Sequence, residues 1–406
     1  MESLEEKLRS LGVFTGASNI ISAKRINTNP IETVIEGEYS FSPFGITFIA
    51  NQLIPFGSLH GNFELTKNVN PDILTGFLGI NLNAPVSLEE IIFLDTETTG
   101  LSGGAGTLVF LAGLGYYSPA GFHLSQIFLD KPGEEKAFLS ALECILSPFK
   151  LMITYNGKSF DIPLLNNRGI INNFSSPFSS LHHIDLLHLT RKVWKLSYTD
   201  RSLGTLEQQV LQFQRSGEDI PGWLVPSRYI DYLHDGDARP LAGVFYHNGI
   251  DILSLAALYS HLSDILIDPY ETDEDYFELI SIAYIHECKK ETEKAISLYK
   301  KAINICMPDN SSIWPLFRLA NLYKLVGDWQ NAIQYWEKAA LHDDYKSCIE
   351  LAKYYEHKSK DISTAIFWTQ KAILLSGSRK QINSINNCST LSRRNDRLRE
   401  KKGREK

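Results

Sequence analysis

The first two-thirds of the chain alternates short apolar runs with polar turns. Ile91-Ile92-Phe93-Leu94 is a continuous apolar run, which is typical of a strand buried on both faces. Runs at 107–117 and 122–129 are separated by Ser-Pro-Ala-Gly and are predicted to form an antiparallel pair. A helix is predicted at 134–146 and a strand at 151–155. This alternation predicts an α/β layer architecture.

From residue 274 to residue 375 the pattern is purely helical and repeats itself. Pairs of Ala residues recur with offsets of 37 and then 32 to 33 positions. This period is similar to that of tetratricopeptide repeats, about 34 residues. Gly327 is predicted to form the turn between the helices of the middle copy. The three helix pairs would either stack into a domain that binds a protein partner or only cap the preceding domain. The Ala pairs are Ala283 and Ala295, Ala320 and Ala332, and Ala352 and Ala365.

These changes of pattern divide the chain into four predicted segments. Residues 1–86 form a strand-rich extension without legible chemistry, and residues 87–268 form the α/β domain. Residues 274–376 form the helical repeats, and residues 377–406 form a basic tail.

Charge sets the tail apart from the rest of the chain. The tail has ten Lys or Arg against three Asp or Glu, a net charge of +7, whereas the whole chain carries −7 and the preceding residues therefore −14. Few large apolar residues are present to offset the entropy of ordering, so the tail is predicted to be disordered. It would serve either as a phosphate-seeking arm or only as a solvated tail.

The remaining composition predicts a soluble, cytoplasmic protein that does not enter a membrane. Acidic residues stand at the N-terminus, where a signal peptide would be basic. The longest apolar run, 107–117, is far shorter than the roughly 20 residues that a membrane span needs. The five cysteines are scattered, so neither a disulfide framework nor a thiolate zinc site is predicted.

Three acidic segments stand at the ends of predicted elements. Asp95 and Glu97 are two apart in a strand, so their side chains share one face, roughly 7 Å apart, and can share a metal ion. Asp161 fits the N-terminus of a helix, where it could equally act as a simple cap. His247 and Asp251 share one helical face, as an ordinary surface pair also would. Each signal is weak alone, but the three occur in order.

In this order, the segments DTETTG, YNGKSFD and HNGID resemble the three exonuclease motifs of DEDD nucleases over residues 88–265. Within that superfamily the layout is similar to that of YprB-like bacterial proteins, because LGTLEQQVLQFQR and DIPG precede the third motif and helical repeats follow it. The resemblance implies an RNase H-like mixed sheet flanked by helices, followed by an all-α repeat domain and the disordered basic tail.

The resemblance also implies roles for individual residues. Asp95 would bridge two Mg²⁺ or Mn²⁺ ions, which hard oxygen ligands select. His247 would orient or deprotonate the attacking water. Thr98 and Asn156, in the first and second motifs, are expected to contact the substrate. The four metal-binding carboxylates would be Asp95, Glu97, Asp161 and Asp251.

The third motif departs from the family pattern. The His variety of the family usually places His five residues before Asp, and the Tyr variety places Tyr four residues before Asp. Here His247 has the four-residue spacing to Asp251 and Tyr246 the five-residue spacing. Since i+4 separates two side chains by about 40° around a helix and i+5 by about 140°, His247 is predicted to serve.

The sequence therefore predicts a metal-dependent 3′–5′ exonuclease that hydrolyses DNA or RNA by a two-metal-ion mechanism. One alternative is a catalytically weak nucleic-acid-binding scaffold whose repeats recruit a protein partner. Another is a phosphatase or nucleotidase with similar metal ligands, which the order of the motifs disfavours.

Two other motifs are not predicted to be sites. Gly103-Gly104-Ala105-Gly106 lacks the spacing of a dinucleotide-binding or phosphate-binding loop and is predicted to join two strands. His182 and His183 have no second ligand cluster, and the nearby Asp185 is expected to position a helix beside the acidic site.

Overall fold

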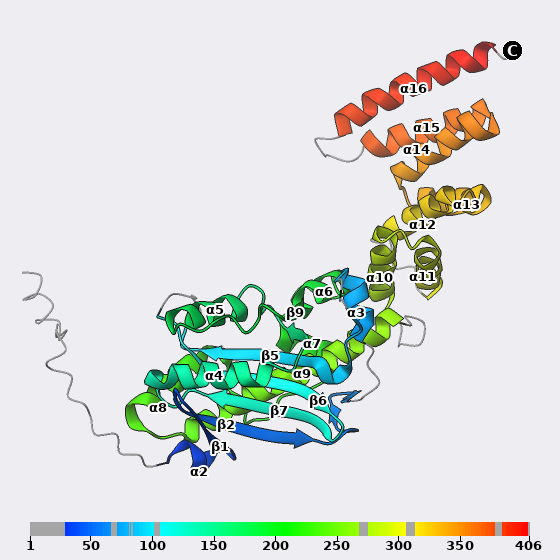
Figure 1. Cartoon of the computed structure of the whole chain (residues 1–406). Coiled ribbons are helices and arrows are strands. Elements are labelled where there is room, and N and C mark those ends of the chain that lie inside the picture. The colour runs from blue at the N-terminus through cyan, green and yellow to red at the C-terminus, as the bar shows by residue number, and fades with distance from the viewer. Residues whose placement is uncertain are drawn as a thin grey trace, which may run out of the picture. The chain divides into compact units, whose positions relative to one another are not determined.

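The computed structural model describes residues 29–65, 71–80, 82, 84–100, 106–267, 275–305, 313–377 and 384–404 (Figure 1). These residues belong to two compact units. The first unit comprises residues up to Leu186 together with Ser202–Ser263, and the second comprises Leu187–Arg201 together with the residues from Asp264 onward.

A seven-stranded mixed sheet forms the centre of the first unit, in the order β1-β2-β7-β6-β5-β8-β9. The strands from β1 to β5 in this order pair antiparallel, whereas β5, β8 and β9 pair parallel. A two-stranded ladder of β3 and β4 is separate. The strands are β1 (Glu38–Ser42), β2 (Gly45–Ile54), β3 (Leu59–His60), β4 (Phe63–Glu64), β5 (Ile91–Thr98), β6 (Val109–Ser118), β7 (Gly121–Phe128), β8 (Leu151–Thr154) and β9 (His182–Asp185).

The predicted strands in this unit are confirmed, including the antiparallel pair of β6 and β7. The strand-rich segment before residue 86 also contributes to the same sheet, because β2 pairs along β7 with Phe48 opposite Phe128. Both phenylalanines are fully buried. Strands β1 and β2 thus widen the sheet of the α/β region, whereas β3 and β4 of the same N-terminal segment form the separate ladder.

Helices cover both faces of the sheet, with α4 and α9 on opposite sides (Figure 1). On the α9 side, Gly113 and Gly115 of β6 leave room for the helix. A Cβ atom at these positions would lie 2.3 Å from Asn248 Oδ1 and 2.5 Å from the Ile252 side chain. The helices of the first unit are α2 (Ile31–Val34), α3 (Pro71–Leu78), α4 (Glu135–Leu146), α5 (Asp161–Ile171), α7 (Leu203–Gln209), α8 (Val225–Asp235) and α9 (Ala242–Ile267), whereas α6 (Leu186–Val193) lies almost entirely in the second unit.

The stretch Arg239–Ile267, which contains α9, is long and apolar enough to span a membrane. However, 67% of its most apolar window is buried inside the protein. Ile252, Leu255 and Leu258 are among its fully buried side chains. Within the described part of the chain, this helix is therefore the core helix of the sheet.

The second unit consists of helix hairpins that follow the predicted repeat. All six Ala residues of the predicted pairs are buried, which lets the two helices of each hairpin pack closely. The helices are α10 (Tyr276–Cys288), α11 (Thr292–Ile305), α12 (Trp314–Leu325), α13 (Trp329–Leu341), α14 (Tyr345–Tyr354), α15 (Ile362–Gly377) and α16 (Ser384–Arg404), with a π-helical turn at Tyr355–Ser359.

Residues 187–201 belong to the second unit, although they lie between parts of the first unit in the sequence. Trp194 Nε1 donates a hydrogen bond to Glu278 Oε2 at 2.7 Å, and Ser197 Oγ donates to Asp275 Oδ2 at 2.7 Å. Trp194 itself is fully buried. The segment is therefore part of the packing of α10, the first repeat helix.

The prediction that the basic tail is disordered is wrong for residues 384–404, which form helix α16. Leu398 is fully buried in a cluster with Ile362. Arg394 and Arg397 donate to the buried Glu356 carboxylate at 2.5 and 2.7 Å. The packing of Leu398 and the buried Glu356 anion therefore order a segment that is polar in composition, and Glu356 neutralises part of its charge.

Each repeat hairpin turns at a residue with a left-handed φ: 63° at Lys290, 84° at Gly327 and 64° at Lys360. These positions follow the same offsets as the Ala pairs, but Gly stands at only one of them. Because a residue with a Cβ is strained at such φ, we expect Lys290→Gly and Lys360→Gly each to raise the free energy of unfolding of the second unit by about 1 kcal/mol. Urea unfolding followed by circular dichroism measures this.

Gly327→Ala should lower that free energy by a similar amount, because a Cβ at Gly327 has open space and only backbone strain changes. Lys289→Gly is the matched control, since Lys289 has an ordinary right-handed φ of −81°. If Lys290→Gly destabilised as much as Lys289→Gly, backbone strain at the turn would not be the cause.

Candidate functional site

Asp95 and Glu97 lie near the end of β5, on the face that α9 covers. Asp95 pairs with Gly113 and Glu97 with Leu111 in the β5–β6 register. Paired residues of an antiparallel ladder point to the same side, so both carboxylates face the helix where Gly113 lets it approach. The strand therefore places the two side chains in the narrow space between sheet and helix, as predicted.

Asp161 is the first residue of α5 and is buried. It accepts a hydrogen bond from Thr96 Oγ1, which stands between Asp95 and Glu97 on β5. The turn before α5 is held by Asp185 at the end of β9, whose carboxylate accepts the backbone N–H groups of Asn156 at 2.8 Å and Lys158 at 3.1 Å. Asp185 thus positions the start of α5, the role expected for it.

Asn248 of α9 connects the helix to Asp95, and the sequence interpretation missed it. Its amide nitrogen donates to Asp95 Oδ2 at 3.0 Å, and its amide oxygen accepts from Gln126 Nε2 at 3.0 Å. Asn248 is fully buried. Two fixed partners orient the amide, so it holds one oxygen of Asp95 in place.

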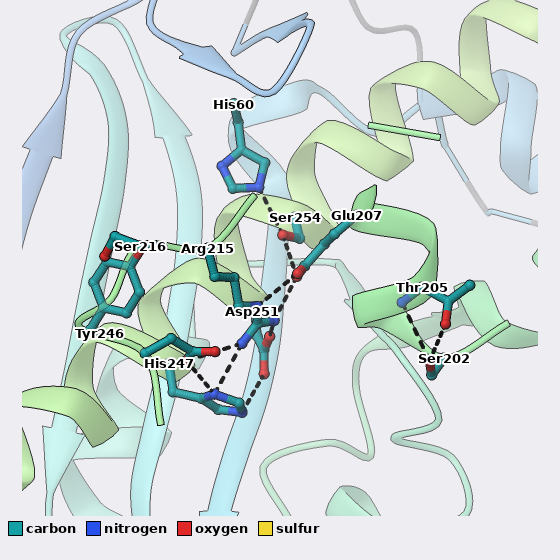
Figure 2. Close-up of polar contacts among 11 residues, drawn as sticks. His60, Ser202, Thr205, Glu207, Arg215, Ser216, Tyr246, His247, Asp251 and Ser254 are labelled. Atoms are coloured by element: carbon teal, nitrogen blue, oxygen red, sulfur yellow. Dashed lines mark hydrogen bonds and ion pairs between the residues drawn. The ribbon is translucent and has the colours of Figure 1, made fainter. Parts of the chain in front are cut away.

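His247 lies beside Asp251 on the same face of α9 (Figure 2). Its Nε2 is 3.6 Å from Asp251 Oδ2, and its Nδ1 is 2.8 Å from Asp219 Oδ1. Tyr246 lies apart from these residues in Figure 2, and its hydroxyl accepts the backbone N–H of Ser216 at 3.0 Å. The structure thus joins His247 rather than Tyr246 to the acidic residues.

Arg215 is the other residue that sequence reasoning missed (Figure 2). It makes two hydrogen bonds to Glu207, at 2.6 and 2.7 Å, and one to Asp251. Its Nη1 is 3.0 Å from His247 Nδ1 and 3.5 Å from Asp219 Oδ1. Although burial opposes it, the hydrogen bonds to Glu207 and the nearby Asp251 raise the pKa of this guanidinium. Arg215 therefore brings a permanent positive charge into the acidic site.

Behind Arg215, a chain of hydrogen bonds runs into the core. Glu207 is fully buried and accepts Ser254 Oγ at 2.8 Å, and Ser254 contacts His60 Nε2 at 2.8 Å. His60 stacks on Phe213 with ring centroids 4.0 Å apart. Burial lowers the pKa of His60 to about 4, so this imidazole is neutral at physiological pH. Glu207 is thus anchored on both sides.

The four carboxylates predicted as metal ligands have raised pKa values. Burial is the main cause of the rise for Asp95 and Glu97, and the negative charges of Asp251 and Asp161 add to it. Burial raises the pKa of Asp161 to about 6. Burial also raises the pKa of Asp251, although Arg215 opposes this rise. The four residues therefore form one electrostatic cluster whose full ionisation needs added positive charge.

This donor set fits a divalent cation. One ligand atom each from Glu97, His247 and Asp251 can lie within 4.8 Å of one another, the only such group of His, Cys, Asp or Glu found among the described residues. Carboxylate oxygens suit hard cations such as Mg²⁺ and Mn²⁺. Asp95 and Asp161 interact electrostatically with this group and could complete the coordination.

A pocket of about 800 Å³ opens beside these residues. It is lined by α7, by the loop that carries Arg215 and Asp219, and by the His247–Asp251 face of α9. Phe213 and Pro221 give it an apolar border. The pocket is large enough to receive part of a substrate next to the acidic cluster.

The two predicted substrate contacts have other local partners. Thr98 is buried and its Oγ1 donates to the Gly100 carbonyl at 3.0 Å, so this hydroxyl stabilises the turn after β5. Asn156 adopts a left-handed φ of 63° and its backbone N–H is bound by Asp185. Substrate contact by either residue stays a prediction. Gly103 to Ala105 of the glycine-rich loop lie outside the described residues.

Comparisons with known proteins agree with this arrangement. Residues 92–263 match the RNase H superfamily, and residues 316–345 match the tetratricopeptide repeat. The chain is 35% identical over 285 residues to the uncharacterized protein YprB of Bacillus subtilis, covering 68% of this chain and 67% of that protein. The chain belongs to the YprB-like family of the RNase H superfamily. The predicted family, mixed sheet and helical repeats are therefore confirmed.

A similar solved structure is the crystal structure of the APC/C heterotetramer Cut9–Hcn1. The match has a TM-score of 0.26 and 13% sequence identity. It covers 64% of this YprB-like chain and 56% of the other chain, less than two thirds of its length.

Asp161 permits a test of the electrostatic cluster in the metal-free YprB-like protein. Below the ordinary Asp pKa of 3.8 the carboxyl is mostly protonated in both the folded and the unfolded chain, so it has little effect on stability. As the pH rises from about 4 to about 6, ionisation increasingly favours the unfolded chain, because the pKa is raised to about 6 in the folded state. Asp161→Asn, which keeps an acceptor for Thr96, should therefore stabilise the metal-free protein by up to about 3 kcal/mol above pH 6 and not at pH 4.

Thermal unfolding in the presence of a chelator, at pH 4 and at pH 7.5, measures the effect. Asp231→Asn is the control, because the Asp231 side chain is 56% exposed and its removal should change stability little at either pH. Equal destabilisation by Asp161→Asn at both pH values would contradict the electrostatic explanation.

Proposed function

We propose that this protein is a metal-dependent nuclease of the DEDD type that removes nucleotides from the 3′ end of DNA or RNA. The observation that carries the proposal is the grouping of Glu97 with the His247–Asp251 pair beside an open pocket, together with the electrostatic interaction of Asp95 and Asp161 with these carboxylates. Like-charged carboxylates with raised pKa values are costly without a cation, so their collection at one place indicates a binding role rather than a structural one.

In this proposal Asp95, Glu97, Asp161 and Asp251 would hold two divalent ions, the number that the resemblance to DEDD nucleases implies. When bound, such ions would supply activation of water and neutralisation of the leaving 3′ oxygen. The chain supports these ligands from outside: Asn248 fixes Asp95, and Thr96 fixes Asp161. Such fixed ligands need little rearrangement when an ion binds, which favours affinity.

We propose His247 as the general base. A carboxylate only accepts hydrogen bonds, so the contact with Asp219 at 2.8 Å places the imidazole proton on Nδ1. The Nε2 lone pair then faces the side of Asp251, 3.6 Å away, where it accepts a proton from the attacking water. Asp219 stabilises the resulting imidazolium. In this tautomer the Arg215 Nη1–His247 Nδ1 contact at 3.0 Å is not a hydrogen bond.

Arg215 favours a second function, that of a nucleic-acid-binding protein with weak catalysis. Its guanidinium donates to Asp251, a proposed metal ligand, and so supplies some of the positive charge that an ion would bring. If this contact persisted with substrate bound, one metal position would be weakened. A direct measurement of cleavage distinguishes the two functions.

The expected activity is stepwise shortening of a single strand of DNA or RNA in the presence of Mg²⁺ or Mn²⁺. The strand carries a label at its 5′ end and a free, unlabelled 3′ end. Asp95→Asn should abolish this activity, because the proposed bridging ligand loses its charge. His247→Ala should lower the rate about 10²- to 10⁴-fold, the usual contribution of a general base. Tyr246→Phe is the matched control and should keep the activity. Absence of metal-dependent shortening by the unchanged protein would favour the binding function.

Asp219→Asn should lower the cleavage rate while leaving divalent-ion binding unchanged, because Asp219 acts through His247 and is not a proposed ligand. Calorimetric titration with Mn²⁺ measures binding separately from cleavage. A loss of Mn²⁺ affinity in Asp219→Asn, together with the loss of rate, would show instead that this carboxylate coordinates metal.

A further inference from the structure

A second pocket lies within the second unit, away from the acidic cluster in sequence and chemistry. It has a volume of about 350 Å³ and is formed by residues 192–196 together with α10 and α12. Its lining includes three cations and two aromatic rings and no acidic residue. We name it the repeat pocket. Its charged and aromatic lining residues are Lys192, Lys195, Tyr284, Trp314 and Arg318.

The charge of the repeat pocket is only partly compensated. Arg318 Nε donates to Glu287 Oε2 at 2.8 Å, so this guanidinium has an internal partner. Lys192 and Lys195 are exposed, and neither forms an ion pair within the described part of the chain. In a chain with a net charge of −7, two uncompensated lysines beside one another make a local site for an anion.

The aromatic residues add a second kind of contact. Tyr284 is 43% exposed, and the Arg318 guanidinium covers its ring at 4.6 Å from the centroid. Trp314 meets Tyr284 at an interplanar angle of 88° and Tyr299 at 87°. Trp314 is half-buried and lines the pocket, and within the described residues no aromatic ring stacks parallel to it, so a flat group in the pocket could stack on the exposed part of its indole.

We propose that the repeat pocket binds one nucleotide of a single-stranded nucleic acid, with its phosphates at Lys192 and Lys195 and its base against Trp314. Single-strand sites combine cations that follow the backbone with aromatic side chains on which bases stack. An acidic peptide would use the lysines but not the indole. The small volume also suits one nucleotide rather than a folded partner.

This inference rests on the proposed function only in taking the nuclease substrate as the ligand. Binding is measured without divalent ions, by fluorescence anisotropy of a labelled 12-nucleotide single strand with the full-length protein. Lys192→Glu with Lys195→Glu should weaken binding at least tenfold and flatten the dependence on log salt by about 1.4, or about 0.7 per phosphate. Trp314→Ala should weaken it about five- to hundredfold through lost stacking.

The control is Lys300→Glu with Lys346→Glu, two exposed lysines of the second unit outside the pocket that change the net charge equally. The inference is supported if only the pocket variants lose affinity. It is overturned if both double variants lose it equally, if the unchanged protein does not bind the strand, or if a polyglutamate peptide displaces the strand at equal or lower concentration. Because the lysines are exposed, their replacement leaves folding intact even if Trp314→Ala does not.

Failure of this inference and failure of the proposed function give different results. If the repeat pocket is a binding site separate from the acidic site, its lysine variants still cleave a dinucleotide. The Asp95→Asn variant loses cleavage but still binds the 12-nucleotide strand. A lysine variant that lost dinucleotide cleavage as well would assign those residues to the acidic site and refute a separate pocket.

Discussion

The packing of the first unit has to hold carboxylates together between β5 and α9 although their negative charges repel one another. Burial raises the pKa values of Asp95 and Glu97, because water cannot fully solvate these carboxylates, and the negative charge of Asp251 raises both further. Such a cluster survives only where packing fixes it. Gly113 lets α9 approach the sheet, and Asn248 then reaches Asp95 from the helix. The stability of the surrounding core therefore offsets a local cost, as is common at functional sites.

Arg215 shows how the protein neutralises part of this charge with its own side chains. Glu207 holds the guanidinium by two hydrogen bonds, and Ser254 fixes Glu207 in turn. A buried carboxylate with two donors is rigid, so Arg215 is directed toward Asp251 rather than toward solvent. The same loop carries Asp219, which faces His247. One loop thus supplies both the counter-charge and the orientation of the imidazole, and neither depends on the strand that carries Asp95.

Much of the fold could be predicted from sequence, because apolar runs and helical periods are local signals. The strand before Asp95 and the repeat helices follow directly from them. The position of the β1–β2 hairpin in the sheet could not be predicted, since the pairing of β2 with β7 joins residues about eighty positions apart, such as Phe48 and Phe128. Helix α16 was missed for the same reason: Glu356 and Ile362, which order it, are remote in the sequence. Within the site, motif resemblance identified the carboxylates and His247. Arg215 and Asn248 lie inside the segments LGTLEQQVLQFQR and HNGID, but the sequence assigned them no role, because their roles arise only from contacts across the fold.

The distribution of charge explains how an acidic chain can still be suited to nucleic acid. Net charge describes attraction at long range, whereas salt screens exposed charges beyond about 10 Å, so close contacts decide binding. A metal centre built from four carboxylates, as proposed, would itself be acidic, so the first unit would repel a phosphate backbone until cations were bound. Cationic contacts therefore have to be local and paired with contacts that salt does not weaken. Two lysines beside the Trp314 indole meet that requirement, whereas the arginines of α16 that bind Glu356 are already used in holding the helix. Whether a cationic side chain of this protein is free to bind a phosphate therefore depends on its partners within the fold and not on the local excess of positive charge.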